Sequence, residues 1–128
     1  PVRAVPADAG RAYADWRALG ERAEVFDGQL PDVELWVDAL YGIGLSRQPE
    51  GAAQAFIERI NATRLPVLAL DVPSGINADA GNAAGICIRA TRTISFISAK
   101  RGLYTGSARD YCGKVQHDNL DLPDSVRS

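Results

Sequence analysis

The 128 residues suffice for one domain with a buried core, and 46% of them are hydrophobic while 23% are charged. With 14 Lys and Arg against 16 Asp and Glu, the net charge of -2 offers no basic face, so we expect no nucleic-acid partner. The longest apolar runs, such as residues 67–70, are too short to span a bilayer, and nothing indicates a signal peptide. We therefore expect no membrane partner.

Two cysteines, Cys87 and Cys112, are too few for a disulfide scaffold and are not spaced as a metal site. We interpret both as reduced thiols of a cytoplasmic protein, and a single disulfide between them is the alternative. The chain starts at Pro1 and contains 0 methionines. We therefore expect a processed or partial sequence, with a segment missing ahead of Pro1.

Strand-like and helix-like segments alternate, which is typical of an α/β fold with a mainly parallel sheet. The first part predicts a short strand at residues 2–5, a helix at 7–19 and a second short strand at 23–26. Asp8 can cap this helix, and Gly20 suits its C-terminal end. One face of the helix carries three apolar residues, Ala12, Trp16 and Leu19.

The middle of the chain predicts a buried strand at residues 35–40, which leads into a turn with two glycines, Gly42 and Gly44. A helix follows from about Pro49 to 62. Its apolar stripe is Ala53, Phe56, Ile57 and Ile60.

The rest predicts a strand at residues 67–72, a polar loop at 77–85, a strand at 93–97, a loop at 98–106 and a last strand at 115–117. Repeats, low-complexity tracts and internal linkers are absent from the sequence. We interpret residues 1–128 as one domain.

Three of these strands place polar groups at their carboxyl ends, where open parallel sheets bind ligands. Asp38 lies near the end of one strand, Asp71 at the end of the next, and Lys100 just beyond the third. Two carboxylates and an ammonium at one edge suit acid–base chemistry. The alternative is that each aspartate only caps a neighbouring turn.

Two loops add to this edge. The segment from Gly42 to Arg47 can present backbone N–H groups and a guanidinium to a phosphate, although it is not a complete dinucleotide fingerprint. Ser74 follows Asp71, and with Asp38 this segment can supply hard oxygen ligands for a cation. We interpret His117, the single histidine, as structural, and both tryptophans, Trp16 and Trp36, as packing residues.

Taken in order, four segments resemble the YjeF N-terminal domain family, the epimerase domain of NAD(P)H-hydrate repair enzymes. These segments are residues 37–47, 66–81, 90–102 and 106–113. The resemblance implies a Rossmann-like, three-layer α/β/α fold with a mainly parallel sheet. It also implies interconversion of the R and S forms of hydrated NADH and NADPH, which carry a hydroxyl at carbon 6 of the nicotinamide ring.

The resemblance further assigns residues to roles. It implies a potassium ion, with Asp38 and Ser74 matching two of its protein ligands. It implies that Asp71 contacts the substrate together with the loop Gly42, Ile43, Gly44, Leu45, Ser46, Arg47 and Gln48. As the proton donor and acceptor near carbon 6 we expect Asp71 or Asp38, with Lys100 as a weaker candidate.

One departure from the family is the absence of its glycine- and asparagine-rich loop, roughly GNNGGDG, so we expect the N-terminal portion of the domain to be missing. We expect a homo-oligomer and a fused or partner dehydratase that restores NAD(P)H. The rival interpretations are a non-catalytic nucleotide- or protein-binding scaffold of the same fold, and a generic nucleotide-binding α/β enzyme.

Overall fold

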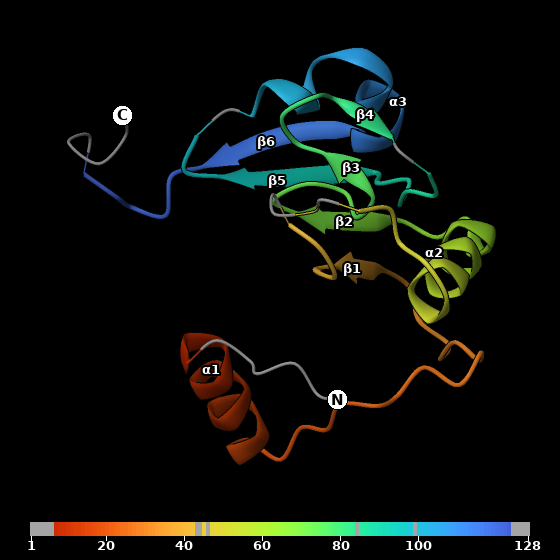
Figure 1. Cartoon of the computed structure of the whole chain (residues 1–128). Helices are drawn as coiled ribbons and strands as arrows, with labels where there is room; N and C mark the ends of the chain where they lie inside the picture. Colours follow the sequence, from red (N-terminus) through yellow and green to blue (C-terminus); the bar gives the residue numbers. More distant parts are fainter. Residues whose placement is uncertain (1–6, 43–44, 46, 84, 99, 124–128) are drawn as a thin grey trace.

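A four-stranded parallel sheet forms the centre of the computed structural model, which describes residues 7–42, 45, 47–83, 85–98 and 100–123. The strands lie in the order β1-β2-β5-β6, and each neighbouring pair is parallel (Figure 1). The parallel sheet and its flanking helices confirm the predicted α/β class and are consistent with the predicted three-layer arrangement. The strands are β1 (Trp36–Asp38), β2 (Val67–Leu70), β5 (Arg92–Phe96) and β6 (Lys114–Asp118).

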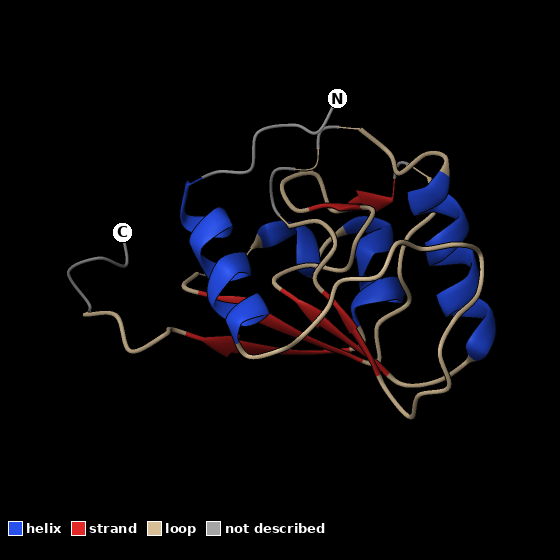
Figure 2. Cartoon of the chain, turned by 90° about the horizontal axis from the view of Figure 1, so that it is seen from below, coloured by secondary structure: helices blue, strands red, loops and turns tan. Residues whose placement is uncertain are grey.

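Side chains alternate between the two faces of the sheet, as the pleat requires. Ala69 and Ser95 have 0% exposure, whereas their strand neighbours Leu68 and Ile94 are only half-buried. The described part of the chain therefore covers one face of the sheet more completely than the other. In Figure 2 the strands of the parallel sheet form a twisted layer, seen nearly edge-on, and a smaller separate sheet lies apart from it.

The helix α2 (Ala52–Thr63) confirms the predicted helix, but it begins two residues after Glu50. Gly51 precedes it with φ 59, which an L side chain rarely adopts, so the helical conformation starts only at Ala52. The predicted stripe faces the sheet. Its contacts form a cluster of Ile57, Ile60, Val67 and Ile88, with Trp36 and Phe56 packed against it.

The predicted loop at residues 77–85 contains a small ladder that the sequence pattern missed. Here β3 (Ile76–Asn77) pairs antiparallel with β4 (Asn82–Ala83). Short helical turns also follow β5, namely η1 (Arg101–Leu103), η2 (Gly106–Ala108) and α3 (Arg109–Cys112). Elements of two to four residues are too short to show a hydrophobic period, and hydrogen bonds between the loops define them instead.

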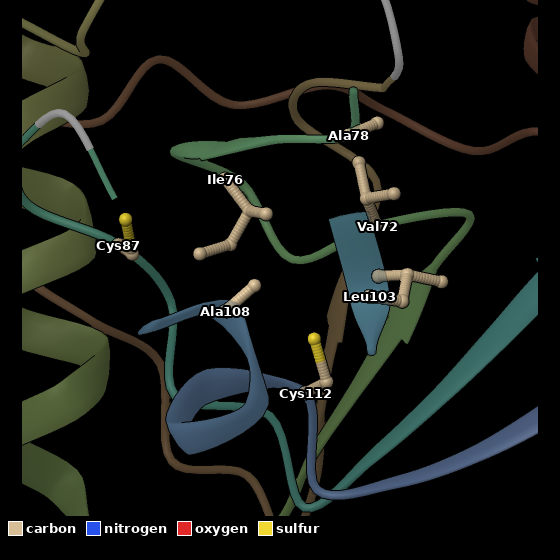
Figure 3. Close-up of a cluster of buried hydrophobic side chains, with 7 residues drawn as sticks. All are labelled: Val72, Ile76, Ala78, Cys87, Leu103, Ala108 and Cys112. Atoms are coloured by element: carbon tan, nitrogen blue, oxygen red, sulfur yellow. The ribbon is translucent and has the colours of Figure 1, made fainter. Parts of the chain in front are cut away.

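These loops close over a second buried cluster, which contains both cysteines (Figure 3). Its members are Val72, Ile76, Ala78, Cys87, Leu103, Ala108 and Cys112. Both thiols are free, which confirms the interpretation of the cysteines as reduced. Burial raises the pKa of Cys87 and of Cys112 from 9.0 to about 11, because a thiolate loses its hydration in the apolar interior.

The first helix, α1 (Ala7–Ala18), confirms the predicted helix and ends before Gly20, but it buries no residue. Asp8 lies inside its first turn and pairs with Arg11 at 2.7 Å, so the prediction that Asp8 caps the helix is wrong. Trp16 is 36% exposed and contacts Tyr13, with ring centroids 5.8 Å apart. Figure 1 shows α1 apart from the sheet, so Trp16 packs against Tyr13 of its own helix and outside the buried core.

The remaining segments complete the comparison with the sequence. Residues 23–26 form no strand, because the described chain offers no neighbouring strand for their backbone, and Phe26 instead packs edge-on against Phe56 at 4.9 Å. The strand predicted at residues 2–5 lies outside the described residues. No helix in the described residues is long and apolar enough to cross a membrane.

The buried thiols predict a loss of stability at high pH. Between pH 9 and about 11 the folded chain keeps thiol protons that the unfolded chain has released, so the free energy of unfolding falls as the pH rises through this range. Below pH 9 the thiols are protonated in both states, so their contribution to the free energy of unfolding is fully present. Urea denaturation at several pH values should show a flatter decline for the Cys87→Ala/Cys112→Ala variant than for the wild type, and equal declines would contradict the assignment.

Candidate active site

The three polar residues predicted to share one sheet edge do lie there. Asp38 is the last residue of β1, Asp71 follows β2, and Lys100 follows β5. Parallel strands all end at the same edge, which is the side of the arrowheads in Figure 1. The structure divides the residues into two neighbouring groups, one around Asp38 and one around Asp71.

Asp38 is bound to the loop that follows β2. Its Oδ2 accepts a hydrogen bond from the Ser74 backbone N–H at 2.7 Å, and its Oδ1 accepts one from the Ser74 hydroxyl at 2.6 Å. The N–H of Leu40 donates a third, longer bond of 3.3 Å to Oδ1. Asp38 is 7% exposed and Ser74 is 0% exposed, so these donors compensate a nearly buried charge.

Asp71 lies in a strained backbone turn. The N–H of Val72 donates to the carbonyl of Leu70 at 3.0 Å, and Asp71 between them has φ 72. This is a γ-turn in the left-handed region, which non-glycine residues rarely adopt. The backbone N–H of Asp71 is held by the Ile94 carbonyl of β5 at 2.7 Å. Non-glycine residues with such strained backbone angles cluster at functional sites, so the turn supports a functional role for Asp71.

The Asp71 carboxylate is paired with Lys100. Lys100 Nζ donates to Asp71 Oδ1, to Ser95 Oγ at 3.2 Å and to the Phe96 carbonyl at 3.1 Å. The side chains of Lys100 and Asp71 are 14% and 23% exposed. An ion pair that is only partly desolvated keeps the carboxylate within reach of a ligand from solvent.

Gly42 joins the two groups. A Cβ at Gly42 would lie 3.6 Å from Asp71 Oδ2, and the preceding N–H of Tyr41 donates to Ser74 Oγ at 3.0 Å. The loop after β1 therefore passes beside both carboxylates. The second Asp71 oxygen faces this loop, while the first faces Lys100.

The rest of the predicted substrate loop is described in part. Ile43, Gly44 and Ser46 lie outside the described residues. Leu45 is half-buried, and Arg47 and Gln48 are exposed. Gln48 lies against the chain near β4, since a Cβ at Gly85 would approach its Cδ to 3.1 Å.

The predicted potassium ligands meet, and their chemistry fits a hard monovalent cation. Asp38 contributes a carboxylate and Ser74 a hydroxyl, and the Tyr41 carbonyl lies 3.5 Å from Ser74 Oγ. Oxygen atoms of these kinds are the ligands that such ions prefer. The described residues contain no group of three or more His, Cys, Asp and Glu that could hold a metal ion.

His117 is not part of this edge group. Its Nε2 shares a hydrogen bond with the hydroxyl of Tyr104, and their ring centroids are 5.9 Å apart. Ser95 was not anticipated from the sequence, although it is fully buried and contacts Lys100. The available signal was a serine on the covered face of a strand, where a hydroxyl requires a partner.

Residues 2–102 match the family model described as YjeF-related protein N-terminus. The chain belongs to this family. The matched range includes Asp38, Asp71, Ser74 and Lys100, and so covers both groups of the site.

Proteins with related sequences carry consistent names. A protein named NAD(P)H-hydrate epimerase from Achromobacter xylosoxidans (strain A8) is 47% identical over 124 residues, which cover 94% of this chain and 59% of the relative. One of the same name from Bordetella pertussis (strain CS) is 44% identical over 126 residues, or 95% of this chain and 54% of the relative. The chain thus spans just over half the length of these relatives.

A longer relative, named bifunctional NAD(P)H-hydrate repair enzyme Nnr, comes from Vibrio cholerae serotype O1 (strain ATCC 39315 / El Tor Inaba N16961). It is 40% identical over 119 residues, which cover 92% of this chain and 24% of the relative. Family members of this type therefore occur both as shorter proteins and within a larger one.

The hydrogen bonds of Asp38 predict that replacing one of its carboxylate oxygens by an amide nitrogen destabilises the protein. Asp38→Asn should lower the free energy of unfolding by about 3 kcal/mol, because an amide N–H₂ would replace one of the two oxygens that accept hydrogen bonds from Ser74 and the charge on the acceptor would be lost. Urea denaturation measures the difference. Asp79→Asn, on the exposed Asp79, is the matched control and should stay within about 0.5 kcal/mol of the wild type. An unchanged Asp38→Asn variant would show that this carboxylate does not hold the two loops together.

Proposed function

We propose that the protein containing this chain interconverts the R and S forms of hydrated NADH and NADPH. Membership of the YjeF N-terminal family and the names of the related proteins support this proposal. The single observation in the structure that carries it is Asp71 at the carboxyl edge of the sheet, whose backbone is strained and whose carboxylate is ion-paired and partly exposed. The chain spans just over half the length of the related epimerases.

Asp71 suits the acid–base role better than Asp38 does. Asp38 is 7% exposed, and three donors occupy its two oxygens. The Asp71 side chain is 23% exposed, and its Oδ2 faces the loop at Gly42. A group that exchanges protons with a substrate needs an accessible oxygen, so we assign proton transfer to Asp71 and loop anchoring to Asp38.

The proposed chemistry needs one group that changes its protonation state. When the hydroxyl leaves carbon 6, the ring nitrogen lone pair forms a carbon–nitrogen double bond and the departing oxygen takes a proton to become water. Addition of water to the other face, with loss of a proton, gives the other epimer. Asp71 can donate the first proton in its acid form and accept the second as a carboxylate. Ring opening and closure would use the same donor and acceptor.

The loop from Gly42 to Gln48 is proposed to bind the dinucleotide. Gly42 lies next to Asp71 Oδ2, so a ligand seated on this loop comes close to the carboxylate. Arg47 is exposed and offers a planar guanidinium, which suits the pyrophosphate.

A potassium ion is proposed at Asp38 and Ser74, whose oxygens have the appropriate donor chemistry. When bound, the ion supplies a fixed positive charge beside the substrate loop. In the described structure the Ser74 hydroxyl donates to Asp38, so on ion binding its proton has to turn away from the carboxylate.

We propose a cytoplasmic protein that forms a homo-oligomer and acts with a dehydratase. The dehydratase is either fused to it or separate, because relatives include both epimerases and bifunctional repair enzymes. Epimerisation is useful to a stereospecific dehydratase, since it converts the rejected epimer into the accepted one.

The epimerase activity is measured on the complete protein. Mixed epimers of hydrated NADH are incubated with an S-specific dehydratase, and recovery of NADH absorbance is followed. The wild type should allow full recovery, and Asp71→Asn should reduce the epimerisation rate by about 10²- to 10⁴-fold, because the amide cannot exchange the proton. Asp79→Asn is the matched control and should retain the rate. Recovery of the S form alone with the wild-type protein would favour the binding-scaffold alternative.

Both the activity and the stability of the protein should depend on the cation. Replacing potassium with N-methylglucamine should lower the epimerisation rate, and the thermal unfolding midpoint should rise with potassium chloride concentration, because an ion that binds the folded state stabilises it. The midpoint of the wild type should be higher in potassium chloride than in N-methylglucamine chloride at equal ionic strength. Ser74→Ala should reduce this difference. A wild-type midpoint that depends on ionic strength alone would exclude the site.

A further inference from the structure

Lys100 has an acceptor for each of its donors. Its ammonium contacts Asp71 Oδ1, Ser95 Oγ at 3.2 Å and the Phe96 carbonyl at 3.1 Å. A lysine ammonium has three N–H groups, so these contacts use all of them. A substrate atom could accept a hydrogen bond from Lys100 only by displacing one of the three oxygens.

Ser95 is the least accessible of these partners. It has 0% exposure and lies on β5, with its side chain on the covered face of the sheet. A buried hydroxyl without a partner costs free energy, and the ammonium of Lys100 supplies that partner. The oxygen of Ser95 thus belongs to the rigid sheet, whereas Lys100 lies in the segment that follows it.

The chain of contacts ends at a defined oxygen of Asp71. The backbone of Asp71 is fixed by the turn between Leu70 and Val72, and its Oδ1 is fixed by Lys100. Rotation of the carboxylate is therefore restricted. Its Oδ2 is left facing Gly42, where a Cβ would come within 3.6 Å.

We infer that Ser95 is a positioning residue, which acts through Lys100 to hold the Asp71 carboxylate with Oδ2 toward the substrate loop. This inference rests on the proposed function for the reaction that Asp71 performs. It assigns Lys100 to orientation of Asp71 and leaves proton transfer at carbon 6 to Asp71 itself.

Kinetics of the complete protein test the inference. Ser95→Ala should lower kcat by about 10-fold with KM changed less than about 2-fold, because the carboxylate loses its orientation while the substrate loop is intact. Ser95→Thr keeps the hydroxyl and should restore kcat to within about 3-fold of the wild type.

Thr93→Val is the matched control. Thr93 lies two residues earlier on the same strand and is also 0% exposed, but its hydroxyl donates to the Cys112 carbonyl at 2.7 Å instead of contacting Lys100. The Thr93→Val variant should be less stable than the wild type but should keep the kcat of the wild type. Equal kcat values for Ser95→Ala and the wild type, or equal falls in Ser95→Ala and Thr93→Val, would overturn the inference.

A second readout does not depend on activity. The Lys100 ammonium should give a solvent-protected signal in ¹H–¹⁵N spectra, assigned by its loss in Lys100→Arg. Ser95→Ala should abolish the protection, and Thr93→Val should keep it. If the wild type fails to epimerise while the signal depends on Ser95, the proposed function fails and the positioning contact remains. If the wild type is active and the Lys100 signal stays protected in Ser95→Ala, the positioning role of Ser95 is excluded while the proposed function stands.

Discussion

The buried carboxylate of Asp38 is the constraint on which the rest of the site depends. A charge that is 7% exposed is costly unless donors surround it, and Ser74 supplies two of them while Leu40 supplies the third. These bonds join the loop after β1 to the loop after β2. Ser74 then accepts from the N–H of Tyr41, which places Gly42 beside Asp71. One buried acid thus fixes the position of both loops that form the proposed site.

The two aspartates of the site have different surroundings and therefore suit different tasks. The Asp38 carboxylate accepts hydrogen bonds from neutral donors, and its nearly complete burial suits a residue that anchors the loops or binds an ion. Asp71 has a cation as its partner and retains an oxygen that faces the loop. The backbone adds to this difference, because Asp71 is held in a strained turn at the end of β2. A similar turn follows β5, where Ile97 has φ 67 and Ser98 donates to the Phe96 carbonyl, so two adjacent strands end in the same way.

Both buried clusters stabilise the elements that carry the carboxyl edge of the parallel sheet. One joins α2 to the sheet, and the other joins the loops around β3, β4 and α3 to Val72, which follows β2. Val72 belongs to the second cluster and directly follows Asp71, so packing of the core and the position of the carboxylate are coupled. By contrast α1 buries no residue and makes no part of either cluster. The site therefore depends on residues from β1 onward within the described chain.

The sequence by itself determined the parallel strands, the helix α2 and the presence of Asp38, Asp71 and Lys100 at one edge. These features follow from local hydrophobic period and from the rule that parallel strands end on the same side. Tertiary structure alone decided the partners, Asp38 with Ser74 and Asp71 with Lys100, and the roles that follow from them. It also decided that Ser95 reaches the site, that β3 pairs with β4, and that residues 23–26 remain unpaired. A side-chain contact or a strand pair requires two segments distant in the sequence, and a local pattern records only one of them.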